Sequence, residues 1–193
     1  MTKETIVAKN KTHLSQLIKD EIRQNGVNCD LNHINVSNIT DMSYLFYTSR
    51  FNGNIDQWDV SNVRDMRHMF LNSKFNQNIS CWDVSKVKNM SFMFYGSKFN
   101  QNISKWDVSN VEYMPYMFSQ SSFNQDISNW RPIRLINKDY IFKCSSSFAK
   151  NNIPYWVDVD IEFLEQTINT YQLQRKLNMT LGQKLDRCNV IKI

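Results

Sequence analysis

Glycine and proline are scarce in this chain, whose 193 residues contain four glycines and three prolines. Such a composition leaves little room for a flexible linker. Cysteine is equally sparse, and Cys29, Cys81, Cys144 and Cys188 lie too far apart to form a C-x-x-C pair. The cysteines therefore suggest neither a zinc ribbon nor a thioredoxin-type site, and free thiols in a reducing compartment are the simplest account.

Long apolar stretches are also missing. No segment approaches the roughly 18 apolar residues of a membrane span, and the amino-terminal residues have no apolar core of signal-peptide length. We therefore expect a cytoplasmic protein without membrane insertion, or a surface protein if a leader has been removed. Apolar residues nevertheless make up 41% and aromatic residues 13% of the chain, which is ample for a packed core.

Charge of one sign is not concentrated anywhere in the chain. The formal net charge is +5 and the sequence pI is about 9.0, but the basic residues are scattered, without a run of five. Such an excess permits weak attraction to nucleic acid, to an anionic membrane or to an acidic protein, and it is most typical of a solvated surface.

Motifs of the common enzyme classes are absent. The chain contains no G-x-x-x-x-G-K-[ST], no G-x-S-x-G and no H-E-x-x-H. His13, His33 and His68 have no carboxylate or cysteine partner at a repeated ligand spacing. We therefore expect no catalytic residues, no metal site and no cofactor.

What the sequence does contain is an internal repeat of about 24 residues. Tryptophan marks it at Trp58, Trp82, Trp106 and Trp130, and the first three open W-D-V-S-[NK]-V-x-x-M-x-x-M-F. A fixed period in this range predicts a solenoid, in which one supersecondary unit per repeat stacks on its neighbours.

Aligning the units gives about eight apolar columns per repeat. The spacing from tryptophan to the two valines predicts a short extended segment, and M-x-x-M-F predicts a single helical turn. The column members besides tryptophan are Val36/60/84/108, Ile39/Val63/87/111, Met42/66/90/114, Leu45/Met69/93/117, Phe46/70/94/118, Phe51/75/99/123 and Ile55/79/103/127.

The fold predicted from this pattern is an α/β solenoid of five units across residues 29–157, with short parallel strands and helical caps at both ends. Residues 1–28 form the first cap: a loose polar start over 1–9, then a helix over 12–24 with Thr12 as its N-cap and Asn25-Gly26 as its stop. The fifth unit, from Trp130, is degenerate and stretched. Residues 158–193 form a helical C-terminal cap.

Polar columns recur with the apolar ones. Asp59, Asp83 and Asp107 follow the tryptophans, and serine and asparagine columns accompany them. A carboxylate column suggests metal binding or acid–base catalysis, but Asp, Ser and Asn also satisfy backbone donors at turns, and every turn of a solenoid needs them. Because these residues occur in every unit, we predict the structural role.

The repeat F-N-Q-[ND]-I-S-x-W-D-V-S-N-V-x-x-M-x-x-M-F, preceded by C-D-L-N-x-I-x-V-S-N-I-T-D-M-S-x-L-F, closely resembles the BspA-like leucine-rich repeat family, the DUF285 type of bacterial surface proteins. The resemblance covers about residues 10–130 and weakens to 156. It implies a parallel, right-handed solenoid of the leucine-rich-repeat kind that binds other macromolecules. It implies no catalytic residues.

Positions that vary between units are free of packing constraints and so available for binding. We predict a partner-binding surface of exposed aromatic and basic side chains, although such rings also commonly cover the flank of a core. The candidates are Tyr44, His68, Phe92 and Tyr116 in one column, Tyr47, Leu71 and Tyr95 in a second, and Arg50, Lys74 and Lys98 in a third.

The function predicted from the sequence is a non-catalytic protein–protein interaction module with a partner of unknown identity. A sharper form of this hypothesis is a stand-alone cytoplasmic binder or inhibitor, encoded by a phage or mobile element against a host defence protein. The alternatives are a fragment of a bacterial surface adhesin and a nucleic-acid-binding solenoid.

Overall fold

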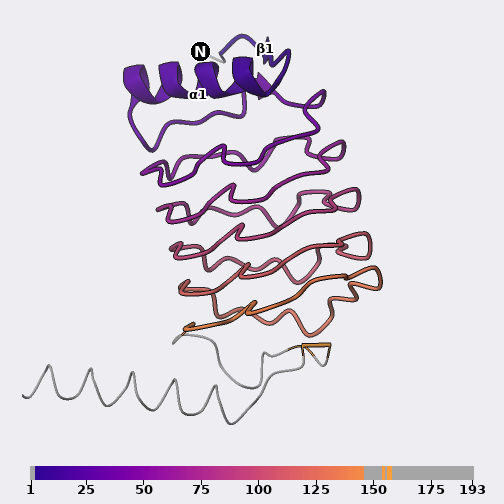
Figure 1. Cartoon of the computed structure of the whole chain (residues 1–193). Coiled ribbons are helices and arrows are strands. Elements are labelled where there is room, and N and C mark those ends of the chain that lie inside the picture. Colours follow the sequence, from indigo (N-terminus) through magenta and orange to yellow (C-terminus); the bar gives the residue numbers. More distant parts are fainter. Residues whose placement is uncertain (1–2, 146–153, 155, 158–193) are drawn as a thin grey trace, which may run out of the picture. The chain divides into compact units, whose positions relative to one another are not determined.

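The computed structural model describes residues 3–145, 154, 156 and 157. The chain divides into two compact units, Met1–Val157 and Asp158–Ile193. The C-terminal helical cap predicted over 158–193 and most of the stretched last turn therefore lie outside the described residues. Within the first unit, one helix and a stack of similar coils follow each other along the chain (Figure 1).

Helix α1, Lys11–Asn25, confirms the expected helix and covers the first coil of the stack (Figure 1). Its N-cap is Asn10, not Thr12, because the extended backbone at Asn10 lets its side chain accept a hydrogen bond from the His13 amide at 2.9 Å. The Gly26 amide closes the other end on the Ile22 carbonyl. Leu14 and Ile18 are buried in the common core.

The expectation of a loose start over residues 1–9 is wrong. Strand β1, Ile6–Val7, pairs in parallel with β2, Ile34–Asn35. Ala8 is fully buried and its amide donates to the Asn35 carbonyl at 2.9 Å. A strand of two residues is too short to show the alternation of apolar and polar side chains by which strands are predicted. Its position is fixed by backbone pairing to a distant segment.

The remaining coils that the structure describes contain little regular secondary structure. The strands expected after each tryptophan are not formed there; those residues form turns. Parallel pairing occurs instead at one residue per coil, just before the first methionine of each repeat. These isolated bridges join Asp41, Asp65, Asn89, Tyr113 and Asn137 in sequence.

The helical turn expected at M-x-x-M-F is replaced by a chain of turns that we call the ladder segment, residues 42–48, 66–72, 90–96 and 114–120. In each one, alternate amides donate to the next coil. The amides of Met42, Tyr44, Phe46 and Thr48 donate to the carbonyls of Asp65, Arg67, Met69 and Leu71 at 2.8–3.1 Å. An α-helix would use these same amides internally, so the two structures exclude each other.

Each ladder segment contains two residues with positive φ. Tyr44 and Thr48 have φ of 62° and 52°, and the equivalent pairs are His68/Asn72, Phe92/Gly96, Tyr116/Gln120 and, in the last described coil, Tyr140/Cys144. Tyr44 is the third residue of a turn closed by the Leu45 amide on the Met42 carbonyl. A positive φ is what a type II turn requires at that position.

The predicted apolar columns form the core. All their members are buried except Leu45, which is partly buried. The four tryptophan rings belong to the same buried cluster. Each indole N–H donates to a carbonyl of the preceding coil at 3.0–3.1 Å, from Trp58 to Leu31, Trp82 to Ile55, Trp106 to Ile79 and Trp130 to Ile103. The tryptophan column thus fills the core and also joins adjacent coils.

The structural role predicted for the polar columns is confirmed. The Asp59, Asp83 and Asp107 carboxylates accept hydrogen bonds from the amide two residues ahead, at 2.9–3.1 Å. The same turn recurs at the bridge column except at Tyr113, which has no such acceptor. The residue two positions ahead of it is Pro115, which has no amide to satisfy.

Gly53 provides a stability test of how closely the first coils approach. A Cβ at this position would lie 1.9 Å from the Cys29 carbonyl oxygen, because backbone hydrogen bonds from Asn52 to Val27 and from Leu31 to Asn54 hold the two coils together here. Gly53→Ala should lower the free energy of unfolding by about 1–3 kcal/mol or more. Urea denaturation of the purified protein measures this.

The matched control is Gly96→Ala. Its Cβ would clash with the end of the flexible Asn72 side chain, 2.1 Å from the amide oxygen, whereas the nearest backbone atom, the Asn72 Cα, lies 4.0 Å away. Its φ of 62° is already adopted by side-chain-bearing residues in the other coils. A cost of about 1 kcal/mol is expected. Equal losses at both positions would contradict the close backbone approach at Gly53.

Candidate functional site

The first candidate column forms a continuous stack of rings along the coils. Ring centroids are 4.5 Å apart for Tyr44 and His68, 4.9 Å for His68 and Phe92, and 4.8 Å for Phe92 and Tyr116, with interplanar angles of 5°, 7° and 9°. Tyr140 continues it at 5.0 Å with a tilt of 35°. We call these five residues the ring stack.

The ring stack presents edges rather than faces to its surroundings. His68 and Phe92 have both faces covered by neighbouring rings and are half-buried. The two end residues are the most exposed, at 48% for Tyr44 and 55% for Tyr140. The Lys143 ammonium lies 4.5 Å from the centroid of the Tyr140 ring.

The second candidate column is not uniformly exposed. Tyr47 is 49% exposed and packs edge-on against Tyr44, with centroids 5.9 Å apart. Tyr95 packs against Phe92 at 5.8 Å and is half-buried. Leu71 is only 9% exposed. Tyr47 and Tyr95 therefore extend the ring stack sideways, whereas Leu71 belongs to the core.

The third candidate column is exposed along its length. Arg50, Lys74 and Lys98 all lie at the surface, and none of them forms an ion pair with a residue that the structure describes. Lys88, from a neighbouring column, is paired with Glu112 at 2.9 Å. The three cations are thus available to a partner.

Rings of adjacent coils lie closer together in the ring stack than in the buried phenylalanine columns. Centroid separations rise from 4.5–5.0 Å in the ring stack to 5.5 Å for Phe46 and Phe70 and 6.3 Å for Phe75 and Phe99. Backbone hydrogen bonds join the coils in the ladder segments and also beside Phe75, where the Lys74 amide donates to the Ser49 carbonyl at 3.0 Å. There the Asn76 amide donates in addition to the Asn52 side-chain oxygen at 2.8 Å.

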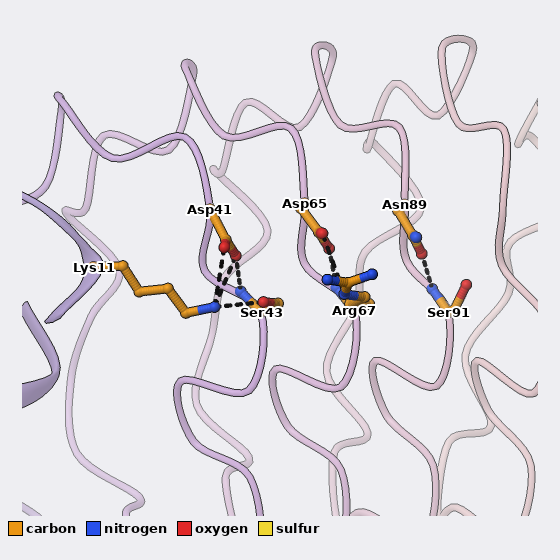
Figure 2. Close-up of polar contacts among 7 residues, drawn as sticks. All are labelled: Lys11, Asp41, Ser43, Asp65, Arg67, Asn89 and Ser91. Carbon is orange, nitrogen blue, oxygen red and sulfur yellow. Dashed lines mark hydrogen bonds and ion pairs between the residues drawn. The ribbon is translucent and has the colours of Figure 1, made fainter.

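A row of polar contacts runs from α1 along successive coils (Figure 2). It lies beside the ring stack, because its members Ser43, Arg67 and Ser91 directly precede ring-stack residues in the sequence. Lys11, at the start of α1, donates to both carboxylate oxygens of Asp41 at 3.0 and 3.1 Å and to the Ser43 hydroxyl. One coil further on, Arg67 is paired with Asp65 at 3.3 Å. In the third coil Asn89 accepts a hydrogen bond from the Ser91 amide at 2.9 Å.

The Lys11, Asp41 and Ser43 cluster has the residue types of a serine nucleophile and its base, but its geometry is structural. Ser43 is 2% exposed, so no substrate reaches its hydroxyl. Burial raises the pKa of the Asp41 carboxyl, yet hydrogen bonds from Ser43 and Lys11 outweigh it and hold that pKa below its ordinary value. The ionised carboxylate thus anchors α1 to the first coil.

Two further properties concern the described residues alone. No group of three His, Cys, Asp or Glu side chains among residues 3–145 is placed to hold a metal ion. No helix in that part of the chain combines the length and the apolar character needed to cross a lipid bilayer.

Two overlapping stretches, residues 12–98 and 73–181, match the family model described as Mycoplasma protein of unknown function, DUF285. The chain belongs to this family. The two DUF285 matches together cover α1 and every coil that carries the ring stack, and their overlap reflects the internal repeat. No curated protein and no solved structure matches the chain.

The variability of the column with Tyr44, His68 and Phe92 located it in the sequence, but the positive φ of these residues was not predicted. The signal lay in the other positive-φ column, which contains Asn72 and Gly96, the residue types that most readily adopt a left-handed backbone. Their 24-residue spacing would have located the turns, and the aromatic column lies four residues before them.

His68 gives the ring stack a predicted pH dependence. Its Nδ1 atom is buried and has no hydrogen-bond partner among the residues that the structure describes. Burial of the ring and then the Arg67 guanidinium lower the pKa of His68 below its ordinary value. The imidazole of His68 therefore binds a proton more readily in the unfolded chain than in the folded one. The free energy of unfolding falls as the pH drops below about 6.5 toward the lower pKa of the folded state. His68→Phe should abolish that loss, measured as the difference in urea midpoint between pH 7.5 and 5.

Tyr116→Phe is the control, because it alters another ring of the stack and keeps the histidine. It should follow the wild-type pH dependence. If His68→Phe also follows it, His68 does not stay neutral in the folded stack.

Proposed function

We propose that this protein is a non-catalytic protein-binding module whose contact surface is the ring stack with its flanking tyrosines and the basic column. The supporting observation is that bulky rings occupy positive-φ positions in successive coils. A left-handed backbone costs roughly 1–2 kcal/mol for a residue with a side chain. Glycine or asparagine would meet the same turn geometry at lower cost.

Stacking offsets part of this cost. Aromatic pairs contribute about 0.5–1.5 kcal/mol beyond their buried area, so the rings stabilise one another once aligned. Packing of the core does not require them, because their edges face outward while the core is filled by the methionine and phenylalanine columns. Strained residues that persist at a surface are typical of binding sites.

The stack geometry favours a protein over a nucleic acid. Single-stranded nucleic acids stack their bases on open aromatic faces, and a base inserted between two rings needs them roughly 7 Å apart, twice the optimal carbon–carbon contact distance. The rings here are separated by 4.5–5.0 Å. They offer rigid edges and tyrosine hydroxyls, which are common anchors of protein interfaces.

The basic column favours a partner with an acidic surface. Arg50, Lys74 and Lys98 repeat once per coil and carry no intramolecular counter-charge among the described residues. A complementary surface is acidic, and such complementarity raises association rates more than it raises affinity. The same proposal includes the finer fold: a right-handed, leucine-rich-repeat-like solenoid with the single-residue bridges in place of its strands.

Removal of the rings without disturbing the turns tests the binding surface. We expect Tyr44→Asn/Phe92→Asn/Tyr116→Asn to fold, because asparagine tolerates positive φ, and to lose the partner. The measurement is affinity capture from a nuclease-treated lysate of the native host. Calorimetry with the purified captured protein follows and should show affinity at least about tenfold weaker, or 1.4 kcal/mol.

The matched control is Thr48→Asn/Gln120→Asn, which changes exposed positive-φ residues of the same segments and removes no ring. It should capture and bind as wild type does. Identical capture by wild type and the ring variant, with both folded by circular dichroism, would refute the proposal.

Charge reversal tests the acidic partner. Arg50→Glu/Lys74→Glu/Lys98→Glu should slow association with the captured protein by about tenfold or more at low salt and flatten its salt dependence. Lys19→Glu/Lys86→Glu/Lys105→Glu changes the net charge equally at exposed residues outside the column. Surface plasmon resonance measures the association rates of the two triple variants. Equal slowing in both would show that only the net charge matters.

A further inference from the structure

The ring stack ends abruptly at Tyr44. The position one repeat earlier lies inside α1, where the chain forms a helix and not a coil, so no ring precedes Tyr44. Among the described residues its one stacked partner is His68, at 4.5 Å and 5°. Tyr47 contacts its edge, and 48% of Tyr44 remains exposed. No ring of the described residues stacks on the face that points away from His68, which we call the open face.

The other end of the described stack is different. There the Lys143 ammonium lies over the Tyr140 ring at 4.5 Å and supplies a cation–π contact. Near Tyr44, the ammonium of Lys11 in α1 donates to the hydroxyl of Ser43, the residue before Tyr44. Lys11 is directed instead to the Asp41 carboxylate (Figure 2), so it does not cover the Tyr44 ring in the same way.

The charges around the open face balance. Lys11 is paired with Asp41 at 3.0 Å and Arg67 with Asp65 at 3.3 Å, and both pairs lie in the row beside the stack (Figure 2). A neutral ring can approach without an unpaired charge being desolvated. A cation would find no unpaired carboxylate in this row to attract it.

From these observations we infer that the open face of Tyr44 is the docking point for an aromatic side chain of the protein partner, which continues the stack by one ring. This inference rests on the proposed function and names the contact within it. The stack itself sets the geometry: near-parallel rings with centroids about 4.5–5 Å apart, as in the three contacts from Tyr44 to Tyr116. Tyr47, whose ring stands at 62° to Tyr44, forms the side wall.

The test uses the full chain with labelled tyrosine rings and N-acetyl-tryptophanamide as the probe, followed by NMR. Titration should shift the ring resonances of Tyr44 and Tyr47 saturably, with one common affinity. Tyr44→Leu should weaken that affinity, read at Tyr47, by at least about tenfold. Tyr113→Leu removes an exposed tyrosine outside the stack and should leave it unchanged.

N-acetyl-argininamide and adenosine are the competing probes. Tighter binding of argininamide at Tyr44 would make the face a cation site, and tighter binding of adenosine would make it a nucleobase site; either result overturns the inference. So does the absence of a saturable shift with tryptophanamide, or an equal loss in Tyr113→Leu.

The outcomes separate this inference from the proposed function. An unshifted Tyr44, together with a partner lost from the ring-stack variant, leaves the binding module standing and rejects the aromatic docking point. Alternatively, tryptophanamide binds saturably but no captured protein depends on the ring stack. That result supports the aromatic site and rejects the protein-binding function.

Discussion

Forward hydrogen bonding within the ladder segments is the constraint on which the rest of this structure depends. In every ladder segment alternate amides donate forward to the next coil, and the amides between them close turns on residues three positions back. That division of donors forces positive φ at two residues per coil, excludes the helix that M-x-x-M-F would otherwise form, and brings one column of side chains to a spacing of 4.5–5.0 Å. Ring stacking follows from that spacing.

Much of the fold could be predicted because its information is periodic. Repeated columns such as the tryptophans and phenylalanines identify the buried side chains, since each coil buries the same positions against its neighbours. Elements fixed by backbone pairing alone could not be predicted: β1 has two residues, and Ala8 is buried beside a segment far along the chain. The helical turn was mispredicted because i, i+3, i+4 apolar spacing also suits consecutive turns with left-handed residues.

The candidate site was predictable only as a set of variable columns. Variation along the sequence located Tyr44, His68, Phe92 and Tyr116, but it could not separate exposed Tyr47 from buried Leu71, which share a column. Nor could it show that the rings cover one another's faces, because ring orientation depends on the backbone conformation.

The forward hydrogen bonds also have an electrical consequence. In the second, third and fourth ladder segments four peptide groups, such as those between Asp65 and Met66 and between Arg67 and His68, accept from the preceding coil and donate to the following one. Their dipoles, about 3.5 D each, point in the same direction along the ladder segments, and groups such as the one between Ser73 and Lys74, which is bonded in the reverse direction, oppose them in part. The polarity is the reverse of an α-helix, with the positive pole toward the C-terminal coils. Lys11, a cation, sits at the negative pole, and each further repeat would strengthen the field that it neutralises.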